Sequence, residues 1–197
     1  MRIFNAFCLA AVFVCGASTA WAQDMRVLTT RTLSPERPYT LSYPDFLKRG
    51  GGFSEIDLDL PAPAMGLPAN GLQVHLQIIP NAPALTPEQA NAQFNAEAVT
   101  AEWRKTFPDF VLGPRGLTQI RSGNALIYNG TLTSKAPGSP LLVLVRVETT
   151  DGGRRYHLDF YIDRASYEKA RELVGFIVAN FSTKADGACC VDPSPIP

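Results

Sequence analysis

Leu141-Leu142-Val143-Leu144-Val145 is an uninterrupted apolar run rich in branched side chains. Such a run is typical of a strand that is covered on both faces of its sheet, because a strand with one face in water alternates apolar and polar residues. Alternation begins only at Arg146, and Asp151-Gly152-Gly153 then supplies residues that accept the positive φ of a tight turn. The sequence therefore predicts a hairpin whose first strand lies inside a sheet.

The return strand of this hairpin, Arg154 to Asp163, alternates and so has two different faces. Its apolar side chains share a face with those of the first strand: Val143, Val145, Val147, Tyr156, Leu158, Phe160 and Ile162. Asp163 can cap a following helix, in which apolar residues recur at intervals of three and four from Tyr167 to Phe181. A strand covered on both faces requires a second helix elsewhere in the chain.

The second helix is predicted between Thr86 and Phe107. Thr86-Pro87-Glu88-Gln89 has a capping threonine, proline at the first helical position and glutamine three residues after the cap. An apolar stripe continues to Phe107, where Pro108 prevents continuation. Phe94 lies off this stripe, so either it packs under a loop or the helix begins later than its cap indicates.

The remaining segments read as strands. Alternation predicts strands in 39–43, 53–60 and 72–78, and a hairpin around Ser122-Gly123, whereas 109–117 is a short strand or an irregular link. Because successive hairpins favour antiparallel pairing, the predicted fold class is α+β: one antiparallel sheet covered by a helix on each face, an α/β/α sandwich.

The first residues predict a cleavable secretory signal over 1–22. Arg2 precedes an apolar core, and Ala20-Trp21-Ala22 matches a small-x-small cleavage site, so we expect a cut after Ala22 and a periplasmic or secreted protein without a stable membrane span. The expected organisation is an N-terminal arm over 23–38, a single domain over 39–182 and a disordered tail over 183–197.

Charge and cysteine content narrow the possible partners. Without residues 1–22 the chain keeps 17 basic and 18 acidic residues, so no bulk attraction to nucleic acid is expected. Cys189 and Cys190 are then the remaining thiols, and they lack a distant partner that would let them crosslink the fold. In an oxidising compartment they could form a ring between neighbours, bridge two chains or bind a soft metal; the competing explanation is an incidental pair in a tail.

Polar residues of the hairpin are the other candidates for a site. Arg146, Arg154, Arg155 and His157 lie on or near its tip and are candidate binding residues. If the strand carrying His75 neighbours the strand carrying His157, the two rings together with Asp159 or Glu148 could form a metal or acid–base site; otherwise they are hydrogen-bonded sheet histidines.

Sequence signatures of common enzymes are absent from the chain: there is no Gly-x-Ser-x-Gly, His-Glu-x-x-His, Gly-x-Gly-x-x-Gly or phosphate-binding loop. We therefore expect no catalytic residues and no cofactor. A hydrolase would need a deep polar pocket containing His75 or His157.

A family resemblance adds to these expectations. An early hairpin, a mid-chain helix, the turn Ser122-Gly123-Asn124-Ala125, the hairpin around 151–158 and the helix 167–181 together resemble the PsbP/Mog-like α/β/α sandwich, which includes bacterial envelope proteins of the DcrB type. The resemblance covers about Tyr39 to Ser182. Known members are mostly non-catalytic: extrinsic subunits of photosystem II, a binder of the Ran GTPase and envelope proteins.

The resemblance implies a binding or assembly role, and no catalytic set carries over. We expect a secreted or periplasmic binding module that contacts another envelope or secreted protein. The alternative is an envelope protein that handles copper or zinc through Cys189 and Cys190.

Overall fold

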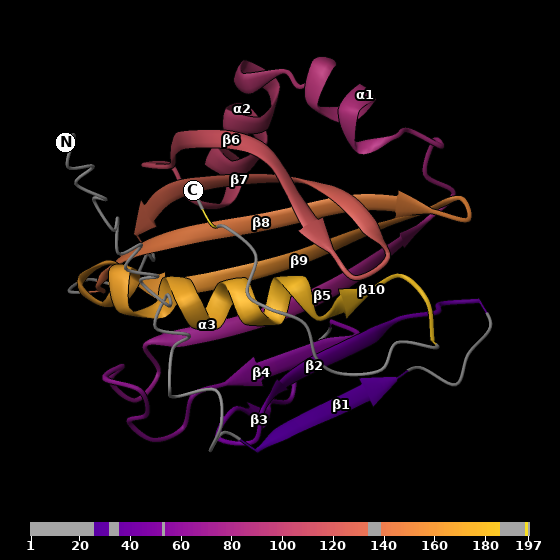
Figure 1. The fold of residues 1–197 in the computed structure, drawn as a ribbon. Helices are drawn as coiled ribbons and strands as arrows, with labels where there is room; N and C mark the ends of the chain where they lie inside the picture. Colours follow the sequence, from indigo (N-terminus) through magenta and orange to yellow (C-terminus); the bar gives the residue numbers. More distant parts are fainter. Residues whose placement is uncertain (1–25, 32–35, 53, 134–138, 186–195, 197) are drawn as a thin grey trace, which may run out of the picture.

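The structure is a computed structural model that describes residues 26–31, 36–52, 54–133, 139–185 and 196 (Figure 1). These residues form a mixed α+β fold with antiparallel sheets and three α-helices. The predicted signal peptide and the thiol pair Cys189-Cys190 lie outside the described residues.

Seven antiparallel strands form the larger sheet, in the order β3-β4-β5-β9-β8-β7-β6. Their bounds are β3 Lys48–Arg49, β4 Ile56–Asp59, β5 Leu72–Pro80, β6 Val111–Ile120, β7 Gly123–Thr133, β8 Leu141–Asp151 and β9 Arg154–Asp163. Strand β8 lies between β9 and β7, so the apolar run that begins at Leu141 is an interior strand as predicted.

The β8–β9 hairpin is confirmed in both register and turn. Val143 pairs with Ile162 and Asp151 with Arg154, which leaves Gly152 and Gly153 as a two-residue turn. Both glycines have positive φ, 54° and 73°, which explains why this turn requires glycine.

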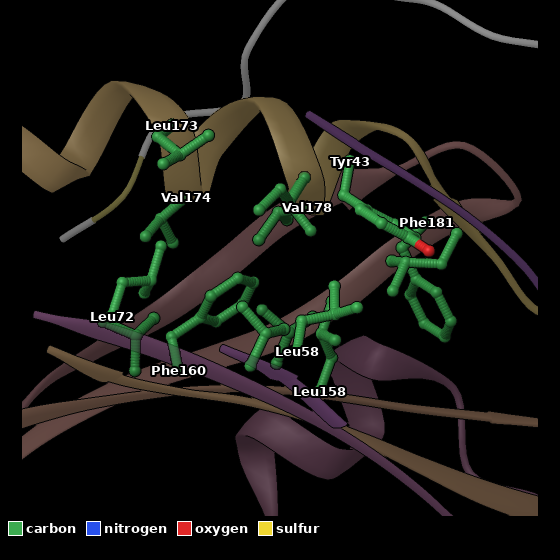
Figure 2. Close-up of a cluster of buried hydrophobic side chains, with 14 of the residues drawn as sticks. Tyr43, Leu58, Leu72, Leu158, Phe160, Leu173, Val174, Val178 and Phe181 are labelled. Atoms are coloured by element: carbon green, nitrogen blue, oxygen red, sulfur yellow. The ribbon is translucent and has the colours of Figure 1, made fainter. Parts of the chain in front are cut away.

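Apolar residues of β8 and β9 that share one face enter the main hydrophobic core. Figure 2 shows Leu158 and Phe160 of β9 facing Leu173, Val174 and Val178 of the last helix. That helix is α3, Tyr167–Ala179, and it follows a short 3-10 turn, η2 Arg164–Ser166, which is capped by Asp163.

A second, smaller sheet was not predicted, and the expectation of one antiparallel sheet was wrong. It has the order β1-β2-β10, with β1 Val27–Arg31, β2 Thr40–Pro44 and β10 Phe181–Ser182. Phe181, which was expected in the last helix, instead pairs with Leu41. Helix α3 ends at Ala179 with Asn180 as its C-cap. The chain then runs beside β2, where the Phe181 ring is fully buried.

The predicted mid-chain helix is two helices. Helix α1, Pro87–Ala92, has the expected capping box at Thr86, and α2, Ala96–Thr106, starts at a separate cap where the Asn95 side chain accepts a hydrogen bond from the Ala98 amide. Phe94 lies between the helices, where its ring contacts Tyr128 edge-on. Phe94 therefore lies off the apolar stripe because the helix is interrupted between Ala92 and Ala96.

Two strand predictions also needed revision. Residues 109–121 give one strand, β6, whose register shifts between Leu112 and Arg115, and the expected strand 53–60 is reduced to β4. The shift contains Gly113 and Pro114, and proline has no N–H for the ladder, which explains why this segment looked irregular in the sequence.

A second hydrophobic cluster involves the other residues of β8. Leu144 packs there with Phe110 and Leu132, and Trp103 and Phe107 of the α2 end pack against them. Since Leu144 alternates with Val143 and Val145, the two clusters lie on opposite faces of β8.

The segment predicted as a C-terminal tail has buried residues where it is described. Thr183 is buried and its hydroxyl bonds Asp151, while Ile196 belongs to the main core and its carbonyl accepts a hydrogen bond from Arg171. Residues 186–195 and 197 lie outside the described part.

Candidate functional site

One row of polar side chains crosses the larger sheet at right angles to its strands. Asp57, His75, Asp159, Arg146 and Tyr128 are directly paired neighbours on β4, β5, β9, β8 and β7. They all lie on the face opposite the main core, because their neighbours along each strand point into that core. We call these five residues the polar row.

Asp57 and His75 form the first pair of the polar row. His75 Nδ1 is hydrogen-bonded to a carboxylate oxygen of Asp57, and the side chain of Asp57 is only 8% exposed. Burial alone would raise the pKa of Asp57, but the hydrogen bonds from His75 and Ser54 lower it below its ordinary value. The imidazole is 29% exposed and lies edge-on to Tyr161, so it is fixed at the surface of the sheet.

Asp159 and Arg146 form the second pair, which is more deeply buried. Nε and Nη2 of Arg146 each donate to one carboxylate oxygen of Asp159 at 2.6 Å, a bidentate geometry. Burial lowers the pKa of Arg146, but the hydrogen bond and charge of Asp159 more than offset this and raise it. Arg146 therefore stays cationic on this face.

Trp103 covers this cation. The guanidinium carbon of Arg146 lies 4.6 Å from the centre of the Trp103 ring, and the indole also stacks on Phe110. The indole N–H donates to the hydroxyl of Tyr128 at 3.2 Å. Burial raises the pKa of Tyr128, so its phenol stays protonated at neutral pH. The side chain of Trp103 in α2 is thus held by two residues of the sheet, Arg146 and Tyr128, and by Phe110 just before β6.

A second group of charges lies toward the hairpin tip. Glu148 is 3.3 Å from His157 Nε2 and 3.4 Å from Arg155 Nε. Burial raises the pKa of Glu148, but His157 and the nearby arginines lower it more, so it lies below the ordinary value. Arg154 lies at the turn itself and donates to the carbonyl of Gly152.

The predicted binding residues thus occupy different environments. Arg146 is 15% exposed and His157 10%, whereas Arg155 is 33% exposed beside the turn. Arg154 and Arg155 are the pair that a partner can reach without displacing part of the fold. The assignment of all four as binding residues stays a prediction.

His75 and His157 do lie on neighbouring strands, β5 and β9. However, His75 pairs with Asp159 in the ladder, and Gln77 pairs with His157, so the two histidines are two positions apart. Each ring has its own carboxylate, Asp57 or Glu148. Within the described ranges, no three His, Cys, Asp or Glu side chains are grouped to hold a metal ion.

Three cavities formed by described residues lie elsewhere. They have volumes of about 210, 580 and 360 Å³, and neither His75 nor His157 lines any of them. The polar pocket that a hydrolase would require around these histidines is therefore not among these three.

Neither the family models nor the curated proteins contain a match to this chain. Solved structures do match. The Ran-binding protein Mog1p of Saccharomyces cerevisiae has a TM-score of 0.52 at 10% identity, over 81% of this chain and 96% of that one. The cyanobacterial PsbP (CyanoP) of Synechocystis has 0.51 at 10% identity, over 88% and 99%.

LpqN of Mycobacterium tuberculosis, described as involved in cell envelope biogenesis, has a TM-score of 0.49 at 10% identity, over 82% of this chain and 94% of that one. The matches to Mog1p and CyanoP define the class: this chain has the PsbP/Mog-like fold, as the sequence resemblance indicated. Among the described helices, none is both long and apolar enough to cross a membrane.

The polar row itself was not predicted. The hairpin sequence places Arg146 and Asp159 in one cross-strand set of charges, and His75 and Asp159 in one conditional site, whereas it gives no site role to Asp57, Tyr128 or Trp103. The alternation of polar residues in 56–59 and 72–78 was the available signal, but it does not say which strands are neighbours.

Proposed function

We propose that this protein is a secreted or periplasmic, non-catalytic module that binds a partner protein through the tip of the β8–β9 hairpin. In this proposal, Arg154 and Arg155 contact the partner, and Arg146 and His157 hold the sheet beneath them in a fixed geometry. The fold is taken as an α/β/α sandwich, with α3 on one face of the larger sheet and α1–α2 on the other.

The observation that carries the proposal is that Asp57, Asp159 and Glu148 each have a basic side chain within ion-pair distance. Asp57 is bonded by His75, Asp159 by Arg146, and Glu148 faces His157 and Arg155. A general base or nucleophile needs a free lone pair next to a substrate cavity, whereas pre-oriented charges at a rigid hairpin suit recognition.

The shared fold adds analogy to this geometry. Mog1p is described as a Ran-binding protein, so a chain of this fold can act through protein contacts. The predicted signal over 1–22 supports export, and an exported protein would meet partners in the envelope or outside the cell.

The test compares the capture of envelope proteins by the purified wild-type protein with their capture by the double variant Arg154→Glu, Arg155→Glu. A specific partner should be retained by the wild type and lost by this double variant, because rim charges govern encounter and orientation. The matched control is Arg26→Glu, since the side chain of Arg26 is 80% exposed and lies on another part of the molecule, beside Asp45.

Retention of the same partner by wild type and the Arg154→Glu, Arg155→Glu variant would refute the assigned surface. Absence of any specific partner would refute the binding role. Intact mass of the exported protein checks the location: it should lack residues 1–22, and a full-length protein confined to the cytoplasm would contradict secretion.

Metal handling through Cys189 and Cys190 is the alternative proposal, and it depends on these two thiols alone. It predicts that Cu(I) or Zn²⁺ binding disappears in the double variant Cys189→Ser, Cys190→Ser. Unchanged metal binding in that variant would exclude it.

A further inference from the structure

Helix α2 is attached to the sheet along one side only. None of its 11 residues is buried, and its contact with the second hydrophobic cluster comes from Trp103. Surface helices of globular proteins usually bury an apolar stripe against the core. Glu97, Ala101 and Arg104, which lie beside Trp103 on the side of α2 next to the start of β6, are exposed and therefore open to contact with another molecule.

A groove runs between α2 and the start of β6. It has a volume of about 580 Å³, and its lining includes Glu97, Thr100, Ala101, Arg104, Val111 and Leu112. Val111 is an exposed apolar side chain, with 57% of its surface accessible. We call these six residues the α2–β6 surface.

The charges of this surface have no partners on their own helix. Glu97 and Arg104 are seven residues apart, about 10.5 Å along the axis, whereas pairs within a helix form between residues three or four apart. Glu97 makes no ion pair with any described residue. Arg104 donates a hydrogen bond from Nε to the carbonyl oxygen of Phe110.

We propose that the α2–β6 surface binds a second copy of this chain about a twofold axis. Two antiparallel α2 helices crossing near Thr100 and Ala101 place Glu97 of each copy beside Arg104 of the other. The same symmetry carries Val111 of each copy into the groove of its mate. Acid and base at equal distances from the crossing point make the surface self-complementary, which is what a twofold interface requires.

The expected dimer is weak. The α2–β6 surface has six residues, whereas a standard stable interface buries roughly 800 Å² and about 20–30 residues per partner. Association should thus depend on concentration and weaken with salt, because its ion pairs are at the rim.

The experiment is sedimentation equilibrium of the purified, processed protein at concentrations from about 10 to 500 µM. A reductant is present throughout, so that a disulfide between copies through Cys189 or Cys190 cannot produce the dimer. The wild type should form a dimer, and Val111→Asp should abolish it.

Charge reversal identifies the contact. In Glu97→Arg, the new arginine of each copy would lie beside Arg104 of the other copy. These two like-charged contacts should weaken association roughly tenfold. Adding Arg104→Glu to this variant restores opposite charges and should return association to within about threefold of the wild type. The control is Glu102→Arg on the same helix, because Glu102 pairs with Lys105 and does not line the groove.

A wild-type protein that stays monomeric over the whole range overturns the proposal and leaves the groove to a different occupant. It is also overturned if Val111→Asp and Glu97→Arg dimerise like the wild type, or if the folded double charge variant stays monomeric. Partner capture through Arg154 and Arg155 is measured separately, so failure here leaves the proposed function standing.

Discussion

Replacing Arg146 by methionine is the sharpest perturbation of the polar row. The change keeps most of the apolar volume but leaves the carboxylate of Asp159, which is 3% exposed, without its bidentate partner. Removing one member of a buried ion pair costs about 3–5 kcal/mol, and loss of the contact with Trp103 adds about 0.5–1 kcal/mol. For a domain of about 5–15 kcal/mol total stability, this is a large fraction.

The assay is urea unfolding followed by the fluorescence of Trp103. The chain has two tryptophans, and the other, Trp21, lies in the predicted signal peptide, so the processed protein reports from the site itself. Arg146→Met should also lower the melting temperature by roughly 7–24 °C, which circular dichroism measures.

A second variant separates the ion pair from general disruption. Arg146→Met together with Asp159→Leu removes both charges and should recover most of the lost stability, because no buried charge is left unpaired. The control Lys105→Met removes a surface cation and should change stability by less than about 0.5 kcal/mol. A loss below about 1 kcal/mol for Arg146→Met, or a double variant as unstable as the single one, would refute the reasoning.

Three further predictions concern other parts of the fold. The folded-state pKa of Glu148 lies below its ordinary 4.5, so the stabilisation from its contact with His157 is present above pH 4.5 and is lost as the pH falls through the folded-state pKa. Glu148→Gln should therefore reduce the loss of stability at acid pH in a plot of unfolding free energy against pH. An unchanged loss would contradict this role of Glu148. Gly130→Ala places a methyl group against the Phe110 ring and should destabilise the domain by about 1–3 kcal/mol in urea unfolding, whereas a neutral result would show that the ring moves freely. Asn95→Ala removes the cap of α2 and should cost about 1 kcal/mol, with no loss expected only if α1 and α2 form one continuous helix.

Local sequence patterns predicted the elements that depend on near neighbours. The β8–β9 hairpin follows from the two glycines that accept positive φ, and α3 follows from apolar spacing after Asp163. The start of α1 at Thr86 was also predicted, since a capping box is formed by residues three apart. The cap at Asn95 was the local signal that was overlooked.

Predictions failed where distant segments decide the structure. The sequence of 39–43 shows a strand but not that it pairs with Val27–Arg31 and Phe181 in a second sheet. The end of α3 was mispredicted for the same reason. The apolar spacing continues to Phe181, but the helix ends at Ala179 and the Phe181 ring packs into the core from β10.

The sequence by itself determined which residues alternate, where the turns fall and which faces are apolar, since these depend on a backbone period of two or 3.6 residues. Only the tertiary structure decided that β5 lies beside β9, more than 70 residues later in the chain, and that Asp57, His75, Asp159, Arg146 and Tyr128 line up across five strands. The physical reason is that pairing and register are settled by burial of the apolar faces of all the strands together, and the polar row is aligned as a result.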